Sequence, residues 1–209
     1  MVTSKGTFYF VARCEGGVIN RSLIPDLYHD MEECSSFTGD LEYTLFDRHD
    51  RLKKEHIEHP TKKGSGIWGA EMNTGYLIFL SGICVDEFHR RKGLGKRMVE
   101  ATIHTIQGTY TEQLLAIFSP DVLVAKLRAD AGDTPYTSAH EDNLKHMYTG
   151  FVRKAGFRRI GHTPYFALAT NPSHPCHRLL ASDDPNTPYP KPKQSAAARK
   201  VESFEAEID

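Results

Sequence analysis

The stretch ICVDEFHRRKGLGKRM, residues 83–98, determines how the rest of the chain is interpreted. It begins at the end of an apolar run, residues 77–85, which predicts a buried strand interrupted at Ser81 and Gly82. It ends in a helical pattern, and Gly93 and Gly95 lie between the two among basic side chains. Glycine allows the backbone to approach a ligand closely, and the first N–H groups of a helix have no partner inside it. This order therefore predicts a loop that binds phosphate groups.

The loop differs from the common nucleotide-binding signatures. It contains no GxxxxGKS/T motif, and its GxG lacks the third glycine of a dinucleotide fingerprint. The pattern Arg90-x-x-Gly93-x-Gly95, which follows an apolar strand ending at Val85, instead resembles the pyrophosphate loop of the GNAT superfamily of acyl-CoA N-acyltransferases. Taken alone, the pattern also fits a solvated basic turn, so a second segment is needed to choose between the two interpretations.

The second segment is NLKHMYTGFVRKAGFRRI, residues 143–160, which resembles the helix and short strand that close a GNAT domain. Its apolar residues share one helical face, and Gly156 follows at the position of a left-handed C-cap. That face consists of Leu144, Met147, Tyr148, Phe151, Val152 and Ala155. Because the two segments occur in the family's order and spacing, the resemblance extends over residues 67–168.

The resemblance implies an α/β fold: a mixed, mostly antiparallel sheet with a splayed parallel strand pair, flanked by helices. It implies acetyl-CoA as co-substrate and an amine-bearing small molecule or peptide as acceptor. The pantetheine arm is expected to lie beside the strand interruption at Gly82, and the backbone N–H of Val85 is expected to point toward the thioester carbonyl. The expected cofactor contacts are Ile83, Cys84, Val85, Arg90, Arg91, Lys92, Gly93, Leu94, Gly95 and Lys96.

Composition is ordinary for a water-soluble enzyme. Apolar residues make up 39% of the 209 residues, charged residues 25%, and the net charge is -1. These values favour a single domain over residues 1–180 with a proline-rich, charged tail over residues 181–209. No apolar run reaches the roughly 18 residues of a membrane span, and the near-neutral charge disfavours a nucleic-acid surface. We expect a cytoplasmic protein, with a nuclear location as the alternative; the acceptor and the oligomeric state do not follow from the sequence.

Cysteine and histidine spacing predicts no metal site and no disulfide framework. The four cysteines are scattered along the chain, which fits a reducing compartment. The HPCH sequence at residues 174–177 has no second ligand pair, so we expect no metal there. Cys84 lies in an apolar strand without a paired base, which favours a small core residue over a covalent acyl carrier.

Local patterns predict the remaining elements. Gly16 and Gly17 are expected to end the first strand, and residues 73–75 are expected to form a hairpin turn. The segment 119–140 is predicted to be an insertion beginning with a helix at residues 121–128, either a specificity element or a surface elaboration. Strands are predicted at residues 7–12, 41–45, 67–71, 114–118, 158–161 and 164–169, and a helix at residues 24–35.

Acyl transfer to an amine is assisted by a base for the amine and an acid for the departing thiolate. Glu71 is the first candidate base, because the expected hairpin would place it near the cleft among apolar neighbours. Asp86, Glu87 and His89 are its rivals, and a chain of water molecules is the alternative to all four.

GNAT helices often carry a tyrosine four residues before the terminal glycine, but this chain has Val152 there, which cannot donate a proton. Tyr148 lies one turn earlier on the same helical face and is therefore the first candidate acid. Tyr165 is the second candidate, and a purely structural role for Tyr148 remains the alternative. Two other functions stay open. One is a non-catalytic acyl-CoA-binding or sensor module, and the other is a nuclear protein in which HRRKGLGKR serves as an import or nucleic-acid patch.

Overall fold

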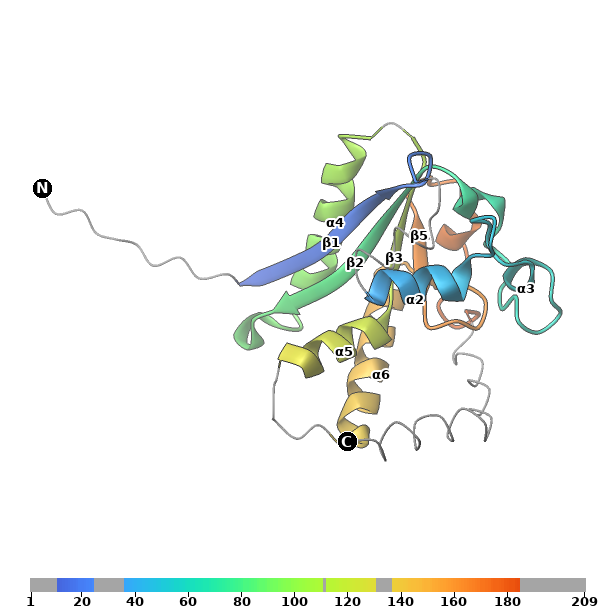
Figure 1. The fold of residues 1–209 in the computed structure, drawn as a ribbon. Helices are drawn as coiled ribbons and strands as arrows, with labels where there is room; N and C mark the ends of the chain where they lie inside the picture. Colours follow the sequence, from blue (N-terminus) through green and yellow to red (C-terminus); the bar gives the residue numbers. More distant parts are fainter. Residues whose placement is uncertain (1–10, 25–35, 111, 131–136, 185–209) are drawn as a thin grey trace, which may run out of the picture.

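The computed structural model describes residues 11–24, 36–110, 112–130 and 137–184. Within them, five strands form one sheet in the order β1-β2-β3-β5-β4 (Figure 1). The strands are β1 Ala12–Asn20, β2 Tyr76–Val85, β3 Leu114–Phe118, β4 Arg158–Arg159 and β5 Phe166–Ala169. Strands β2 and β3 run parallel, and the other neighbouring pairs are antiparallel. The predicted α/β class, with a mixed and mostly antiparallel sheet, is confirmed.

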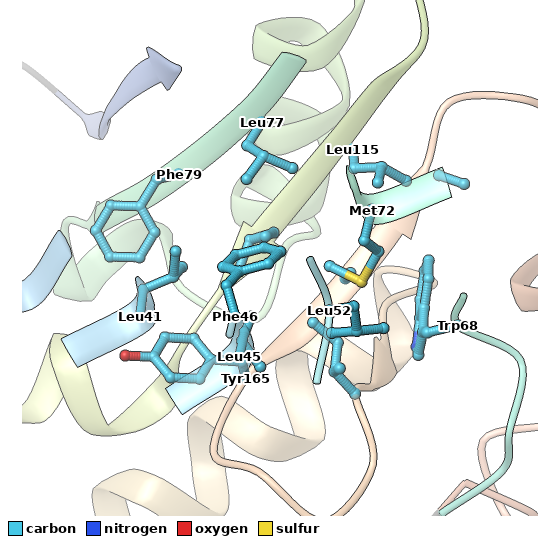
Figure 2. Packing of buried hydrophobic residues seen from close by; sticks show 14 of the residues in the cluster. Leu41, Leu45, Phe46, Leu52, Trp68, Met72, Leu77, Phe79, Leu115 and Tyr165 are labelled. Atoms are coloured by element: carbon cyan, nitrogen blue, oxygen red, sulfur yellow. The ribbon is translucent and has the colours of Figure 1, made fainter. Parts of the chain in front are cut away.

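Helices cover both faces of this sheet (Figure 1). They are α2 Ser36–Leu45, α3 Lys54–Ile57, α4 Leu94–Gln107, α5 Pro120–Asp130 and α6 Ser138–Lys154, with short 3-10 helices η1 Ala70–Asn73, η2 Glu87–His89 and η3 Pro175–His177. Alternate residues of β2 enter two separate cores because successive side chains of a strand point to opposite faces. Leu77 and Phe79 pack with α2, as Figure 2 shows, whereas Ile78 and Leu80 pack with α4 and α6. No described helix is long and apolar enough to cross a membrane.

A β-bulge divides β2 into two halves. Glu15 of β1 pairs with Gly82, but the next residue, Gly16, pairs with Leu80, so Ser81 is an extra residue on β2. The predicted interruption of this strand is therefore confirmed as a bulge. Strand β3 ends at Phe118, opposite Leu80, so beyond the bulge β2 pairs with β1 alone. This separation of the parallel strands is the splay that the resemblance implied.

Gly16 and Gly17 lie inside β1, so the prediction that they end the first strand is wrong. A Cβ atom on Gly16 would collide with the carbonyl oxygen of Phe79 on the neighbouring strand. The glycine thus permits the close approach of the backbones beside the bulge and does not terminate the strand. The strand predicted at 7–12 and the helix predicted at 24–35 lie almost entirely outside the described residues.

The strand predicted at residues 41–45 is helical and belongs to α2. Its alternation of apolar and polar residues also places Leu41 and Leu45 four residues apart, on one face of a helix. Both are fully buried, whereas Tyr43 is 70% exposed. The sequence pattern fits both the two-residue period of a strand and the 3.6-residue period of a helix. The helix is selected by packing of this face against Phe46, Tyr165 and other members of the first core (Figure 2).

The strand predicted at 67–71 is also absent, and residues 73–75 therefore form no hairpin. Residues 70–73 form η1 instead, and the antiparallel neighbour of β2 is β1. Trp68 is buried and its Nε1–H donates to the Arg159 carbonyl at 3.0 Å. This bond fixes the segment before β2 against β4, far along the chain.

The end of α6 follows the sequence pattern closely. Gly156 has a φ of 97° and its N–H donates to the Arg153 carbonyl, while the Phe157 N–H donates to the Val152 carbonyl at 3.0 Å. These two bonds form the Schellman motif, and Phe157 packs in the same core as Val152. The predicted left-handed C-cap is confirmed, as are the helix within residues 121–128 and the β4-β5 hairpin.

The domain extends past the tail boundary expected at residue 181. The Asp184 side chain is completely buried, and its carboxylate accepts hydrogen bonds from Arg153 Nε at 3.1 Å and from the Arg159 N–H at 2.9 Å. The Leu179 carbonyl accepts a bond from Arg158 Nε at 2.8 Å. These bonds attach residues 179–184 to the end of α6 and to β4, and residues 185–209 lie outside the described part.

Asp184→Asn is expected to lower the free energy of unfolding by about 3 kcal/mol, because it leaves Arg153 without its buried counter-charge. Urea unfolding measures the change. Asp183→Asn is the matched control, since Asp183 is exposed. Equal stability of the two variants would contradict the structural role of Asp184.

His56 is expected to make stability depend on pH. The side chain is buried, and burial lowers its pKa from the ordinary value of 6.5. The unfolded chain therefore binds a proton first, and stability should fall as the pH drops below 6.5 and through the lowered pKa. In His56→Gln, the loss of unfolding free energy between about pH 7.5 and pH 5.5 should be smaller than in the wild type. His146→Gln, at an exposed position of α6, should leave that loss unchanged.

Candidate functional site

The basic loop after β2 ends in an open helix N-terminus. Asp86 begins η2 by accepting the Phe88 N–H at 3.1 Å and by pairing with His89 at 3.0 Å. Gly93, with a φ of 77°, precedes the first residue of α4. The N–H groups of Leu94, Gly95 and Lys96 donate to no acceptor among the described residues. Three adjacent free donors at the positive end of a helix dipole suit an anionic group.

The basic side chains of the loop divide into two kinds. Arg90 Nε donates to the Val85 carbonyl at 3.0 Å and Lys92 Nζ to the Phe88 carbonyl at 2.9 Å, so both hold the loop itself. The side chains of Arg91 and Arg97 are exposed and have no ion pair or hydrogen bond with any described residue. They remain available to a ligand. Arg91 also has a φ of 61°, a strained conformation for a residue with a side chain.

Gly95 connects the loop to α6. A Cβ atom on Gly95 would lie 3.1 Å from Phe151 Cε2 and 3.7 Å from Val85 Cγ2. A single Cβ atom would already require the Phe151 ring to shift by a few tenths of an ångström. We expect a branched side chain such as valine to move the first turn of α4, and with it the three free N–H groups, away from Phe151 and Val85.

Beyond the bulge, one edge of β2 faces the space that β3 has left. The Asp86 N–H donates to the Val11 carbonyl at 2.8 Å, and backbone groups of successive residues in a strand point to opposite sides. The N–H groups of Val85 and Ile83 therefore point away from β1. The Val85 carbonyl, on that same side, is the group that Arg90 binds. This orientation agrees with the expected direction of the Val85 N–H.

A hollow of about 40 Å³ lies at this edge, between the second half of β2, β1, α5 and α6. It brings together Ile83, Cys84 and Tyr148, which the sequence had assigned to cofactor binding and catalysis. Helix α5 packs against β2 and α6 (Figure 1). It contributes Leu123 and Leu127 to the lining. A volume of this size accommodates about one water molecule. Side chains of α5 therefore occupy most of the space beside the splayed strand.

Three charged residues of the hollow, Arg13, Glu15 and Lys126, were missed by the sequence analysis. Lys126 of α5 forms an ion pair with Glu15 of β1, and Glu15 Oε1 also lies 3.0 Å from Arg13 Nε. The hydrogen bond from Lys126 is the main cause that lowers the pKa of Glu15. A Cβ atom on Gly82 would lie 3.0 Å from Glu15 Oε2 and 3.5 Å from Lys126 Nζ. The pair thus lies directly over the bulge, in space that a side chain at Gly82 would fill.

Cys84 is exposed, so its interpretation as a core residue is wrong. The bulge supplies the reason, because one extra residue reverses the alternation of side chains along β2. Ile83 packs against the core on the α4 side, and Cys84 faces the hollow beside Arg13.

Glu71 lies at the other end of β2, so the geometry on which its assignment rested is wrong. Its Oε1 accepts the Gly69 N–H at 2.6 Å and lies 3.4 Å from His174 Nε2. The His174 ring stacks on Trp68 with 4.7 Å between centroids. The strand between Tyr76 and Val85 separates this cluster from the loop by about 30 Å, at 3.3 Å per residue.

The other candidates for proton transfer are placed differently. Asp86 and His89 pair with each other, and Asp86 and Glu87 are exposed on η2. Tyr165 is fully buried in the core shared with α2 and donates to Asp40 Oδ2 at 2.7 Å (Figure 2). Burial raises the pKa of Tyr165 far above its ordinary value. Of the two candidate tyrosines, only Tyr148 lines the hollow.

A larger hollow of about 420 Å³ lies between α5 and α6. Ion pairs cross it at 3.1 Å, from Lys145 to Asp121, and at 3.3 Å, from Arg128 to Glu141. At about 100° per residue, the α5 residues that line it lie on the opposite side of that helix from the group Leu123, Lys126 and Leu127 taken together. It is therefore separate from the hollow beside β2. No group of three or more residues suited to holding a metal ion occurs in the described part.

Comparisons with family models, with curated proteins and with solved structures found no match for this chain.

Proposed function

We propose that the protein is an acetyl-CoA-dependent N-acetyltransferase that transfers the acetyl group directly from the CoA thioester to an amine. One observation carries the proposal: the edge of β2 freed by the bulge leads directly into a glycine loop with three unpaired N–H groups at a helix N-terminus. A ligand with an extended polar arm and a pyrophosphate fits such an edge and such a loop.

In this proposal, the N–H groups of Leu94, Gly95 and Lys96 bind the pyrophosphate, and the free guanidinium groups of Arg91 and Arg97 add charge. The arm then runs along the second half of β2, with its polar atoms bonded to backbone groups. A backbone N–H that points into the gap, at Ile83 or Val85, can stabilise the negative oxygen that develops on the thioester carbonyl.

Tyr148 is the proposed acid for the departing thiolate, because it lines the same hollow as Ile83 and Cys84. Glu71 has no part in the proposed reaction, since it lies at the far end of β2 with His174. The proposed transfer is direct and forms no covalent intermediate on the protein. The amine attacks the thioester carbon, the C–N bond forms and the C–S bond breaks.

A second candidate function is acyl-CoA binding without catalysis. The position of α5 favours it, because Leu123, Lys126 and Leu127 occupy most of the space where an acceptor would meet the thioester. A sensor needs the phosphate loop and a helix that responds to the ligand, and it needs no acid. Turnover with amines distinguishes this function from the transferase.

Acetyl-CoA is expected to stabilise the folded protein, by about 2.7 kcal/mol at a concentration one hundred times the Kd. Thermal unfolding with and without acetyl-CoA measures this effect. Gly95→Val should abolish the stabilisation by moving the N-terminus of α4 away from Val85 and Phe151. Gly150→Val is the matched control, because a side chain at this helical position meets no atom within 4 Å. Unchanged stabilisation in Gly95→Val would refute the loop assignment.

Tyr148→Phe is expected to lower turnover by about ten-fold or more and to leave the acetyl-CoA stabilisation unchanged, since only a proton donor is removed. Release of free CoA thiol over a panel of primary amines measures turnover. Tyr43→Phe, at an exposed position of α2, is the control. Full turnover in Tyr148→Phe would return Tyr148 to a packing role, and stabilisation by acetyl-CoA without turnover in the wild type would favour the sensor.

A further inference from the structure

The Lys126 side chain carries a primary amine into the hollow beside β2. Lys126 belongs to the inserted helix α5, and its ammonium group contacts the Glu15 carboxylate of β1. It lies over Gly82, at 3.5 Å from the position of a Cβ atom there. The absence of a side chain at Gly82 is what allows Nζ to come this close to the β2 backbone. Ile83 and Tyr148 line the same hollow.

We propose that Lys126 is an acyl acceptor of this site, so that the protein acetylates its own inserted helix. The inference rests on the proposed acetyltransferase function and goes beyond it by naming a modification site. The ammonium group lies beside the segment of β2 along which the proposal places the thioester, within reach of it once the side chain leaves Glu15. A thioester whose carbonyl oxygen accepts the Ile83 N–H would lie one residue from Gly82, over which Nζ lies.

The reaction at Lys126 balances with groups that the hollow contains. Once the ammonium has left Glu15, it loses one proton to the solvent, because the lowered pKa of Glu15 makes that carboxylate a weak base. The neutral amine attacks the thioester carbon, the C–N bond forms and the C–S bond breaks. The second proton of the nitrogen goes to the CoA thiolate, directly or through the Tyr148 hydroxyl. An ammonium and a thioester thus become an amide, a thiol and one released proton.

Other lysines are placed differently. Lys62 pairs with Glu55 at 2.7 Å, and Lys145 pairs with Asp121 at 3.1 Å. Both pairs have exposed fractions close to those of Lys126 and Glu15. Neither pair lines the hollow beside β2. Lys62 is about as exposed as Lys126 and is also paired with a glutamate, but it lies away from the edge of β2. Its acetylation rate therefore measures the spontaneous reaction with the thioester.

The small volume of the hollow supports the choice of Lys126. An acyl group fits only if a side chain that lines the hollow moves aside. A lysine can move easily, because it has four rotatable bonds and an end that water hydrates strongly. Its displacement from Glu15 opens space beside Gly82 while Leu123 keeps its place in the core. Acetylation removes the charge, so the modified side chain cannot restore the ion pair between α5 and β1.

The test is site-resolved mass spectrometry of the full chain incubated with acetyl-CoA and no added amine. Lys126 should gain an acetyl group at least about ten times faster than Lys62, a ratio in the range of positioned proton transfer. The rate per molecule should not depend on protein concentration, because the acceptor belongs to the same chain. Gly95→Val should reduce the rate at Lys126 to that at Lys62, and Gly150→Val should not.

Two variants complete the test. Lys126→Arg keeps the charge and should remove the fast site, whereas Lys62→Arg should leave it unchanged. If acetyl-CoA stabilises the protein and amines are acetylated, but Lys126 reacts no faster than Lys62, the self-acetylation is refuted and the transferase stands. If Lys126 reacts equally fast in Gly95→Val, the labelling is spontaneous and the inference is refuted. If acetyl-CoA neither stabilises the protein nor supports turnover, the proposed function fails first.

Discussion

The extra residue in β2 is the constraint on which the site depends. Because Ser81 has no partner on β1, the side chains of the second half of β2 exchange faces. Ile83 thereby enters the core beside α4, and Cys84 and Gly82 face the hollow. The N–H groups of Ile83 and Val85 point away from β1. Strand β3 pairs with β2 over all five of its residues and ends at Phe118, opposite Leu80, so the second half of β2 has no strand neighbour on that side before the basic loop.

The inserted helix α5 determines what can use that free edge. A sheet edge with unpaired backbone groups is normally covered or charged, and α5 does both by placing Leu123 in the core and Lys126 against Glu15. The cover is attached to β1 through one partly exposed ion pair, which contributes little to stability. Replacing an ion pair of this kind by a ligand changes the free energy little, whereas exposing the Leu123 side chain to water is unfavourable. If a ligand enters as we propose, we expect the polar side of the hollow to open.

Local signals made half of this architecture predictable. The bulge, the order of strand, loop and helix around Gly93 and Gly95, and the C-cap at Gly156 each depend on neighbouring residues, and each was confirmed. The pattern at residues 41–45 fits two periods, and only packing against Tyr165 and Phe46 selects the helix. Glu15 and Lys126 are 111 residues apart, and no spacing rule connects a strand residue to an insertion. Cys84 was misplaced because the bulge was recognised but its effect on the following side chains was not applied.

The polar groups at the two ends of β2 have different roles. At the start of the strand, Trp68 donates a buried hydrogen bond to Arg159, and Glu71 accepts the Gly69 N–H and lies beside His174. These contacts use the polar groups of that cluster within the protein. At the end of the strand, the free groups are backbone N–H donors and exposed guanidinium groups, whose hydration a bound anion can replace. The chemistry that we propose is therefore placed at the second end of β2, where the free N–H groups at the start of α4 and the charged side chain of Lys126 lie beside the strand.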